Sequence, residues 1–252
     1  MAPLSALTAL ATPALALFDW VPRSATAVGV LAGPLVVLGY LAGSVPFAYL
    51  LSRRRLRRQL ADPAPDRHYA SPGRGPRSER READATAALP VAATLAATTL
   101  AWHLTLAATP GANTFSGVGV FSNQAIGAWV SVALWTGAAA VAGHVAPVWT
   151  GFRGGSGIPP ALALGVVYVP LLTLVAAGAF LVAYGVTRRP LPSLLRALPV
   201  VVTVAYLTWL ADLQAGWGVT NGPEVTLWTT AVSATLFARN LAPARAGSGS
   251  GT

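Results

Sequence analysis

The chain has 252 residues, of which 54% are hydrophobic and only 10% are charged. A soluble domain carries about 25% charged residues, so the composition excludes an ordinary soluble protein and indicates one embedded in a membrane. The chain has no cysteine, which excludes disulfide bonds and thiolate metal sites. The three histidines, His68, His103 and His144, lack metal-ligand spacing, and the sequence has no zinc, haem or iron–sulfur pattern.

Seven apolar segments follow one another along the chain. The pattern predicts helices at about 27–51, 86–107, 124–142, 158–169, 171–186, 193–211 and 224–241. A helix needs about 20 residues to cross the hydrocarbon core of a bilayer, so 158–169 is expected to be re-entrant or a half-crossing. Pro170 then predicts a helical hairpin that returns the chain to the side it came from. The fold class is an all-α polytopic membrane protein with about seven transmembrane or half-spanning helices.

The arginines predict the topology. All 17 basic residues are arginine, and the formal net charge is +9. With the N-terminus outside, 16 of the 17 lie on or near the cytoplasmic segments and only Arg23 lies outside. The expected cytoplasmic segments are 52–85, 143–157, 187–192 and 242–252. The charge therefore predicts an N-out, C-in protein of the cell membrane, and it is not a signature of nucleic-acid binding.

We expect one membrane domain with flanking segments. Residues 1–26 lack a basic n-region and are expected to be an N-terminal extension rather than a cleaved signal peptide. Residues 27–245 form the membrane domain, and 52–85 within it is a cytoplasmic arginine-rich loop that is expected to be partly disordered. Its arginines could bind anionic lipid head groups or serve only as topogenic charge. Residues 246–252 are expected to be a flexible tail.

Residues 143–157 form a polar segment between two apolar ones. They contain His144, Arg153 and a glycine loop at 154–157, and Pro159 and Pro160 follow in the first turn of the next helix. Glycines let backbone N–H groups approach an anion, and an arginine beside a helix N-terminus favours phosphate. A tight interhelical turn would explain the same pattern.

A second informative segment runs from Gly39 to Arg53. Pro46 within a predicted helix would free a backbone carbonyl and kink the helix. The hydroxyl of Ser44 could then cap the freed carbonyl or face a cavity. Alternatively, the four-residue spacing of Gly39 and Gly43, with Ser44 beside them, would let two helices pack closely.

Together these segments resemble the motifs of the bacterial acyl-phosphate:glycerol-3-phosphate acyltransferases, the PlsY family. The first motif reads roughly GSIPFxYLxxK, and it is matched by residues 43–47 with Arg53 at the basic position. The second reads GHxFPxFxxFKGGKGVAT; Arg153 replaces its first lysine, and the matching residues are Gly143, His144, Pro147, Phe152, Gly154, Gly155 and Gly157. Shorter similarities exist between Thr187-Arg188 with Ser193 and a TRxxSxxS stretch, and between Asn240-Leu241 and a closing NIxRLLxGTE.

The resemblance implies an integral membrane enzyme of phospholipid synthesis. Such enzymes transfer an acyl group from acyl phosphate to glycerol 3-phosphate at the cytoplasmic face, giving lysophosphatidic acid without a cofactor. An apolar groove between helices would hold the acyl chain. The implied catalytic residues are Ser44, Arg53, His144 and Arg153, and the implied substrate-binding residues are Gly154, Gly155, Ser156, Gly157, Arg67, Ser71 and Asn240.

Two of these residues also have structural explanations. His144 would organise the glycine loop or take part in proton transfer, because imidazole titrates near neutrality, but it could equally cap a loop carbonyl. Asn240 would contact the substrate or only cap the last helix.

The chain departs from the family pattern at several positions. Ser156 stands where the second motif has a lysine, and Ile158-Pro159-Pro160 replaces its VAT ending. The family's DIRxxGSGNxGATN element survives only as Asp66-Arg67 and Ala70-Ser71. These losses leave an alternative open, namely a catalytically impaired relative that binds lipid phosphate or regulates a partner enzyme. A small transporter would be expected to carry midplane charge or inverted repeats, and we see neither.

Overall fold

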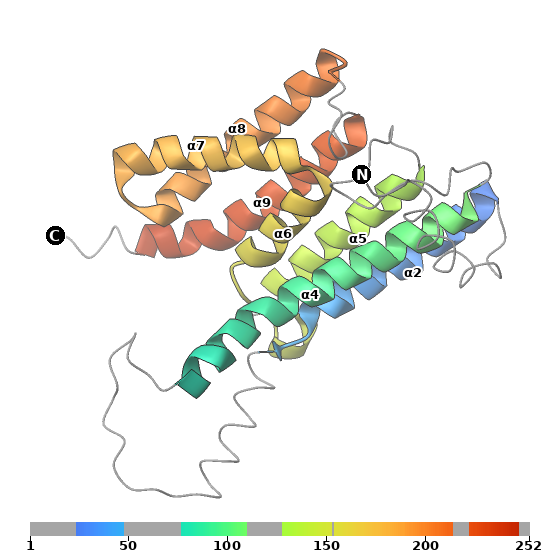
Figure 1. Cartoon of the computed structure of the whole chain (residues 1–252), viewed down its shortest axis with the longest axis horizontal. Helices are drawn as coiled ribbons and strands as arrows, with labels where there is room; N and C mark the ends of the chain where they lie inside the picture. The colour runs from blue at the N-terminus through green and yellow to red at the C-terminus, as the bar shows by residue number, and fades with distance from the viewer. Residues whose placement is uncertain (1–23, 48–76, 110–127, 153, 214–221, 247–252) are drawn as a thin grey trace, which may run out of the picture.

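The computed structural model describes residues 24–47, 77–109, 128–152, 154–213 and 222–246 (Figure 1). Within these ranges the chain forms seven α-helices and one short 3-10 helix. They are α2 (Ala25–Ser44), α4 (Arg77–Ala108), α5 (Ala128–Val145), η2 (Val148–Thr150), α6 (Ile158–Tyr168), α7 (Pro170–Thr187), α8 (Pro190–Leu210) and α9 (Pro223–Ala246). The predicted all-helical fold is confirmed, and each predicted helix overlaps one observed helix.

Five segments of the described chain are long and apolar enough to cross a membrane. They are Thr26–Ser44, Ala88–Ala108, Trp129–Thr150, Pro170–Thr187 and Pro190–Leu210. Helix α6 has 11 residues and is too short, as predicted. Val169 separates it from α7, which starts at Pro170 and pairs with α8.

Local signals set the ends of several helices. The Ser24 side chain accepts a hydrogen bond from the Ala27 N–H at 3.0 Å and caps the start of α2. Helices α7, α8 and α9 each begin with a proline, which the first turn tolerates. Arg188 ends α7 in the left-handed region, with φ 54°.

Two predicted boundaries are wrong. Helix α2 ends at Ser44, so Pro46 follows the helix and does not kink it. The reason is that proline disfavours helical geometry at the preceding residue, and Val45 is extended. At the other boundary, residues 77–85 belong to α4 rather than to a loop. This segment is rich in Arg, Glu and Ala, which are strong helix formers even where the sequence is too polar for a membrane span.

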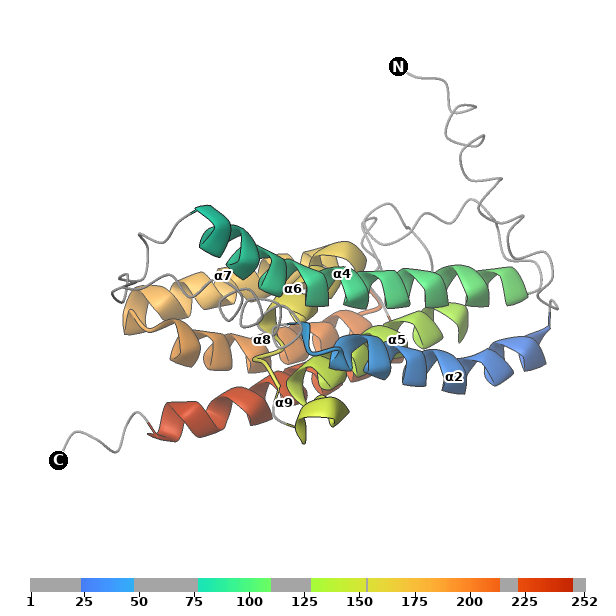
Figure 2. The ribbon, with the colours of Figure 1, turned by 90° about the horizontal axis from the view of Figure 1, so that it is seen from below.

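Helices α2, α4 and α5 lie side by side, while α7, α8 and α9 form a second group, with α6 between the two (Figures 1 and 2). Gly39 and Gly43 of α2 pack against the backbone of α5, where a Cβ atom at either position would collide with the carbonyl oxygens of Thr136 and Ala140. The close-packing explanation of these glycines is therefore confirmed.

Aromatic side chains join α4, α5 and α6 in the core. The rings of Trp102 and Trp129 meet edge to face with centroids 4.7 Å apart, and the ring of Tyr168 lies 5.6 Å from that of Trp102. The Tyr168 hydroxyl also lies 3.2 Å from the Thr99 hydroxyl. These contacts hold the end of α6 against α4 and the start of α5.

Candidate functional site

The glycine loop, residues 154–157, folds back on the C-terminal end of α5. The Gly155 N–H donates to the His144 carbonyl oxygen at 2.9 Å. A Cβ atom on Gly154 would strike that same carbonyl oxygen, and one on Gly155 would strike the His144 imidazole. Gly157 has φ +74° and begins α6. A side chain at 154 would therefore strike backbone atoms, one at 155 would require the His144 ring to move, and Gly157 has a backbone conformation that favours glycine.

Two consecutive residues of α9 hold the loop from its other side. The Arg239 guanidinium donates from Nε to the Gly155 carbonyl oxygen at 3.1 Å and from Nη2 to that of Gly154 at 2.5 Å. The Asn240 side-chain amide donates to the Ser156 carbonyl oxygen at 3.1 Å and to that of Leu236 at 2.8 Å. Three successive carbonyl groups of the loop are thus bonded to α9, so the loop is fixed at both sides.

These bonds determine which N–H groups an anion could meet. Gly155 uses its N–H on His144, the Ile158 N–H faces the Ser156 hydroxyl at 3.4 Å, and the two prolines that follow have none. In the described part of the chain, the N–H groups of Ser156 and Gly157 carry no hydrogen bond. The anion nest expected from the sequence is therefore smaller than a run of four N–H groups.

His144 lies half-buried at the end of α5, with its imidazole against Gly155. It is the backbone carbonyl of His144, not its ring, that bonds to the loop. Among the residues with described positions, none forms a hydrogen bond with the imidazole. Within the described residues, the ring therefore caps no carbonyl of the loop, and its part in the reaction stays a prediction.

Ser44 lies next to this region, at the end of α2. It is fully buried, and its hydroxyl donates to the Tyr40 carbonyl oxygen at 2.7 Å. Tyr40 in turn donates its hydroxyl to the Ala146 carbonyl oxygen at 2.8 Å, and Gly143 packs against Ser44. Ser44 thus caps a carbonyl of its own helix, and this end of α2 lies against the end of α5.

Four predicted site residues, Arg53, Arg67, Ser71 and Arg153, lie outside the described residues. The structure does describe Thr187 and Ser193 of the TRxxSxxS-like stretch. Their hydroxyl oxygens lie 2.6 Å apart, and Ser193 also donates to the Arg189 carbonyl oxygen at 2.6 Å. Both side chains stabilise the turn between α7 and α8.

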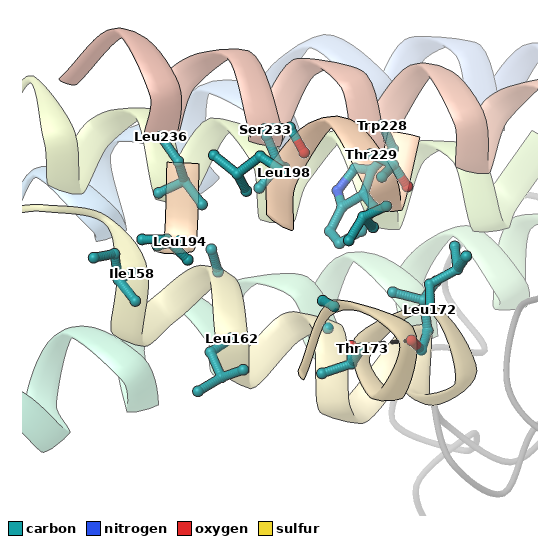
Figure 3. Close-up of a pocket in the computed structure, with 16 residues that line it drawn as sticks. Ile158, Leu162, Leu172, Thr173, Leu194, Leu198, Trp228, Thr229, Ser233 and Leu236 are labelled. Carbon is teal, nitrogen blue, oxygen red and sulfur yellow. Dashed lines mark hydrogen bonds between the residues drawn. The ribbon is translucent and has the colours of Figure 1, made fainter. Parts of the chain in front are cut away.

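An apolar pocket of about 130 Å³ opens beside the glycine loop (Figure 3). We call it the α6–α9 pocket because helices α6, α7, α8 and α9 all line it. Its residues are Ile158, Ala161, Leu162, Gly165, Val169, Leu172, Thr173, Ala176, Leu194, Leu198, Val201, Trp228, Thr229, Val232, Ser233 and Leu236. Ile158 directly follows the loop, and a Cβ atom on Gly157 would lie 3.0 Å from Leu236, so one end of the pocket adjoins the loop.

Sequence reasoning missed Arg239. It counted this arginine only as topogenic charge, although its neighbour Asn240 was a predicted site residue. The only signal in the sequence was that Arg239 is next to Asn240. The two carbonyl groups that Arg239 bonds lie 84 and 85 residues earlier in the chain, so no local pattern indicates the contact.

Comparison with known proteins now decides the family. A sequence model described as "Glycerol-3-phosphate acyltransferase" matches residues 80–243. The chain belongs to this family. A relative from Laribacter hongkongensis, named glycerol-3-phosphate acyltransferase, is 34% identical over 70% of this chain and 77% of its own length.

Two crystal structures of PlsY, an integral membrane glycerol 3-phosphate acyltransferase, share the fold. Its lysophosphatidic acid form has a TM-score of 0.52 at 16% identity and covers 86% of this chain and 92% of that one. Its glycerol 3-phosphate form has a TM-score of 0.51 at 17% identity and covers 85% of this chain and 90% of that one. The resemblance seen in the motifs is confirmed, and the protein is a multi-pass membrane protein with the fold of this family.

Proposed function

We propose that this protein transfers a fatty acyl group from acyl phosphate to the 1-hydroxyl of glycerol 3-phosphate, forming lysophosphatidic acid. Membership of the family supports the proposal, as do relatives that carry the acyltransferase name and the PlsY form with glycerol 3-phosphate. The same names do not favour the catalytically impaired alternative.

One structural observation carries the proposal. The glycine loop is held between α5 and α9 at the end of the α6–α9 pocket. A polar loop that leads into an apolar pocket suits a substrate with a phosphate at one end and an acyl chain at the other. The N–H groups of Ser156 and Gly157, with the neighbouring Arg153, would bind the phosphate, and the pocket would hold the chain.

The proposed reaction needs no protein nucleophile, because acyl phosphate is already activated. The 1-hydroxyl oxygen of glycerol 3-phosphate forms a bond with the acyl carbonyl carbon, and the bond from that carbon to the phosphate oxygen breaks. The His144 imidazole accepts the hydroxyl proton and passes it to the departing phosphate. The loop contributes by positioning the reactants and by stabilising the charge that develops on the phosphate.

We place this site at the cytoplasmic face of the membrane. Helices α2, α5, α7 and α9 all run from right to left in both overall views, so their C-terminal ends point toward the same side (Figures 1 and 2). The positive-inside rule assigns that side to the cytoplasm, because nearly all the arginines lie in or next to the segments that follow these four helices in the sequence.

The test is acyl transfer by the purified protein in detergent, with labelled glycerol 3-phosphate and either acyl phosphate or acyl-CoA. We expect lysophosphatidic acid with acyl phosphate, and much less with Arg153→Ala. Absence of product from folded protein, beside an active family member, would refute the proposal. Full activity in Arg153→Ala would refute only the role of that arginine.

A further inference from the structure

One wall of the α6–α9 pocket carries polar groups without partners. Trp228 and Thr229 of α9 line the pocket and are each only 4% exposed. Neither the Trp228 indole nitrogen nor the Thr229 hydroxyl forms a hydrogen bond within the described part of the chain. Ser233, one helical turn further on, lines the same wall (Figure 3).

Other threonines of α9 show that this arrangement is unusual within the helix. Thr230 donates its hydroxyl to the Thr226 carbonyl oxygen at 2.7 Å, and Thr235 donates to that of Ala231 at 2.8 Å. Such a bond within the helix gives a threonine hydroxyl a partner where the surroundings are apolar. Thr229 lacks this bond, so its hydroxyl is buried without a partner among the described residues, as is the Trp228 indole nitrogen.

The chemistry of the two groups defines their partner. An indole N–H can only donate, whereas a hydroxyl can donate and accept. A buried polar group left unpaired in apolar surroundings is unfavourable, so a ligand oxygen that accepts from Trp228 would be favoured there. A plain hydrocarbon chain offers no such atom, but a hydroxyl group on the chain does.

The position of these groups along the pocket is also defined. Leu236 lies at the end beside the glycine loop, and Trp228 lies eight residues before it on the same helix. At 1.5 Å per residue this separation is about 12 Å. An acyl chain that starts at the loop would therefore reach Trp228 with its interior carbons and not with the carbons next to the carbonyl.

We propose that the α6–α9 pocket binds an acyl chain that carries a hydroxyl group on an interior carbon, with the oxygen bonded to Trp228 and Thr229. This inference rests on the proposed acyl transfer. It adds that the enzyme prefers one class of acyl donor. The enzyme selects hydroxyacyl phosphate over the unsubstituted donor of equal chain length.

The experiment compares acyl phosphates of one chain length with the hydroxyl group at successive positions. We expect kcat/KM for the best interior position to exceed that of the plain donor about tenfold, since the hydroxyl satisfies two buried groups. Thr229→Val keeps the shape of the side chain and Trp228→Phe keeps an aromatic ring, while both remove the polar atom, so each should bring this ratio toward one. The matched controls Trp209→Phe and Thr230→Val, outside the pocket, should keep the ratio.

A second measurement separates this inference from the proposed function. Free hydroxy fatty acid should raise the thermal unfolding temperature of the wild type more than the unsubstituted fatty acid does, and Trp228→Phe should abolish the difference. Transfer of plain and hydroxylated donors at equal rates, or a ratio that both pocket variants retain, would overturn the inference and leave the acyltransferase function intact. If no donor is transferred, the proposed function fails, and the thermal shift alone decides whether the pocket prefers a hydroxylated chain.

Discussion

The Asn240 side-chain amide donates to the Ser156 carbonyl oxygen at 3.1 Å, although 84 residues separate the two in sequence. Asn240 is buried, and the same amide nitrogen also donates to the Leu236 carbonyl oxygen within α9. The last helix is thereby joined to the glycine loop at the end of the pocket. This bond makes the position of the loop depend on α9.

Asn240→Asp tests this connection. The substitution keeps the size of the side chain but replaces the donor with a carboxylate, which would face two carbonyl oxygens. We expect a loss of about 1–3 kcal/mol in unfolding free energy and a large loss of acyl transfer. Thermal unfolding and kinetics on the same purified samples measure both effects. Wild-type activity in Asn240→Asp would show that the bond does not position the loop.

Arg239 supplies a prediction that separates positioning from folding. Its guanidinium bonds to two adjacent carbonyl groups, a geometry that a lysine ammonium does not reproduce. Arg239→Lys and Arg239→Ala should therefore both lower kcat about tenfold or more, with little change in unfolding temperature because Arg239 is exposed. Arg196→Ala, an exposed arginine of α8, is the control and should keep its activity. Full rescue by lysine would mean that Arg239 acts only through its charge.

Gly155 and His144 should be coupled. A methyl group on Gly155 would collide with the His144 imidazole, so Gly155→Ala is expected to destabilise the protein by about 1–3 kcal/mol. Adding His144→Ala removes the collision and should restore part of the stability but not the activity. A double-mutant cycle on unfolding free energy measures this coupling. Gly178→Ala, where the added methyl group meets nothing within 4 Å, is the control. Additive effects of the two substitutions would contradict the geometry.

Helix α2 offers a comparison of two glycines. Gly43→Ala should destabilise the protein by about 1–3 kcal/mol, because the methyl group would strike the Ala140 carbonyl oxygen in α5. Gly33→Ala lies in open space on the same helix and should leave stability unchanged or slightly raised. Thermal unfolding of the two variants in one detergent provides the measurement, and equal unfolding temperatures would argue against the close crossing.

The helices could be predicted because apolar runs of membrane length have few alternative explanations. The errors arose where a local preference opposed the apolar pattern. Pro46 ended α2 within an apolar run, and charged helix formers extended α4 back to Arg77. In both cases the prediction relied on hydropathy alone, whereas the backbone preference of proline or of the helix-forming residues decided where the helix ended or began.

The site was only partly predictable for a different reason. Glycines at 154–157 and the nearby His144 are close in sequence, so their grouping was visible there. The bond from Arg239 to the loop depends on how α9 packs against α5 and the loop, and no local pattern encodes it. The partnerless state of Trp228 and Thr229 likewise depends on a pocket that four helices form together.

The central claim is acyl transfer from acyl phosphate to glycerol 3-phosphate, and the most direct test follows both products at once. Purified protein with acyl phosphate and labelled glycerol 3-phosphate should form lysophosphatidic acid and release phosphate in equal amounts. Phosphate release without lysophosphatidic acid, or neither product beside an active family member, would contradict the account.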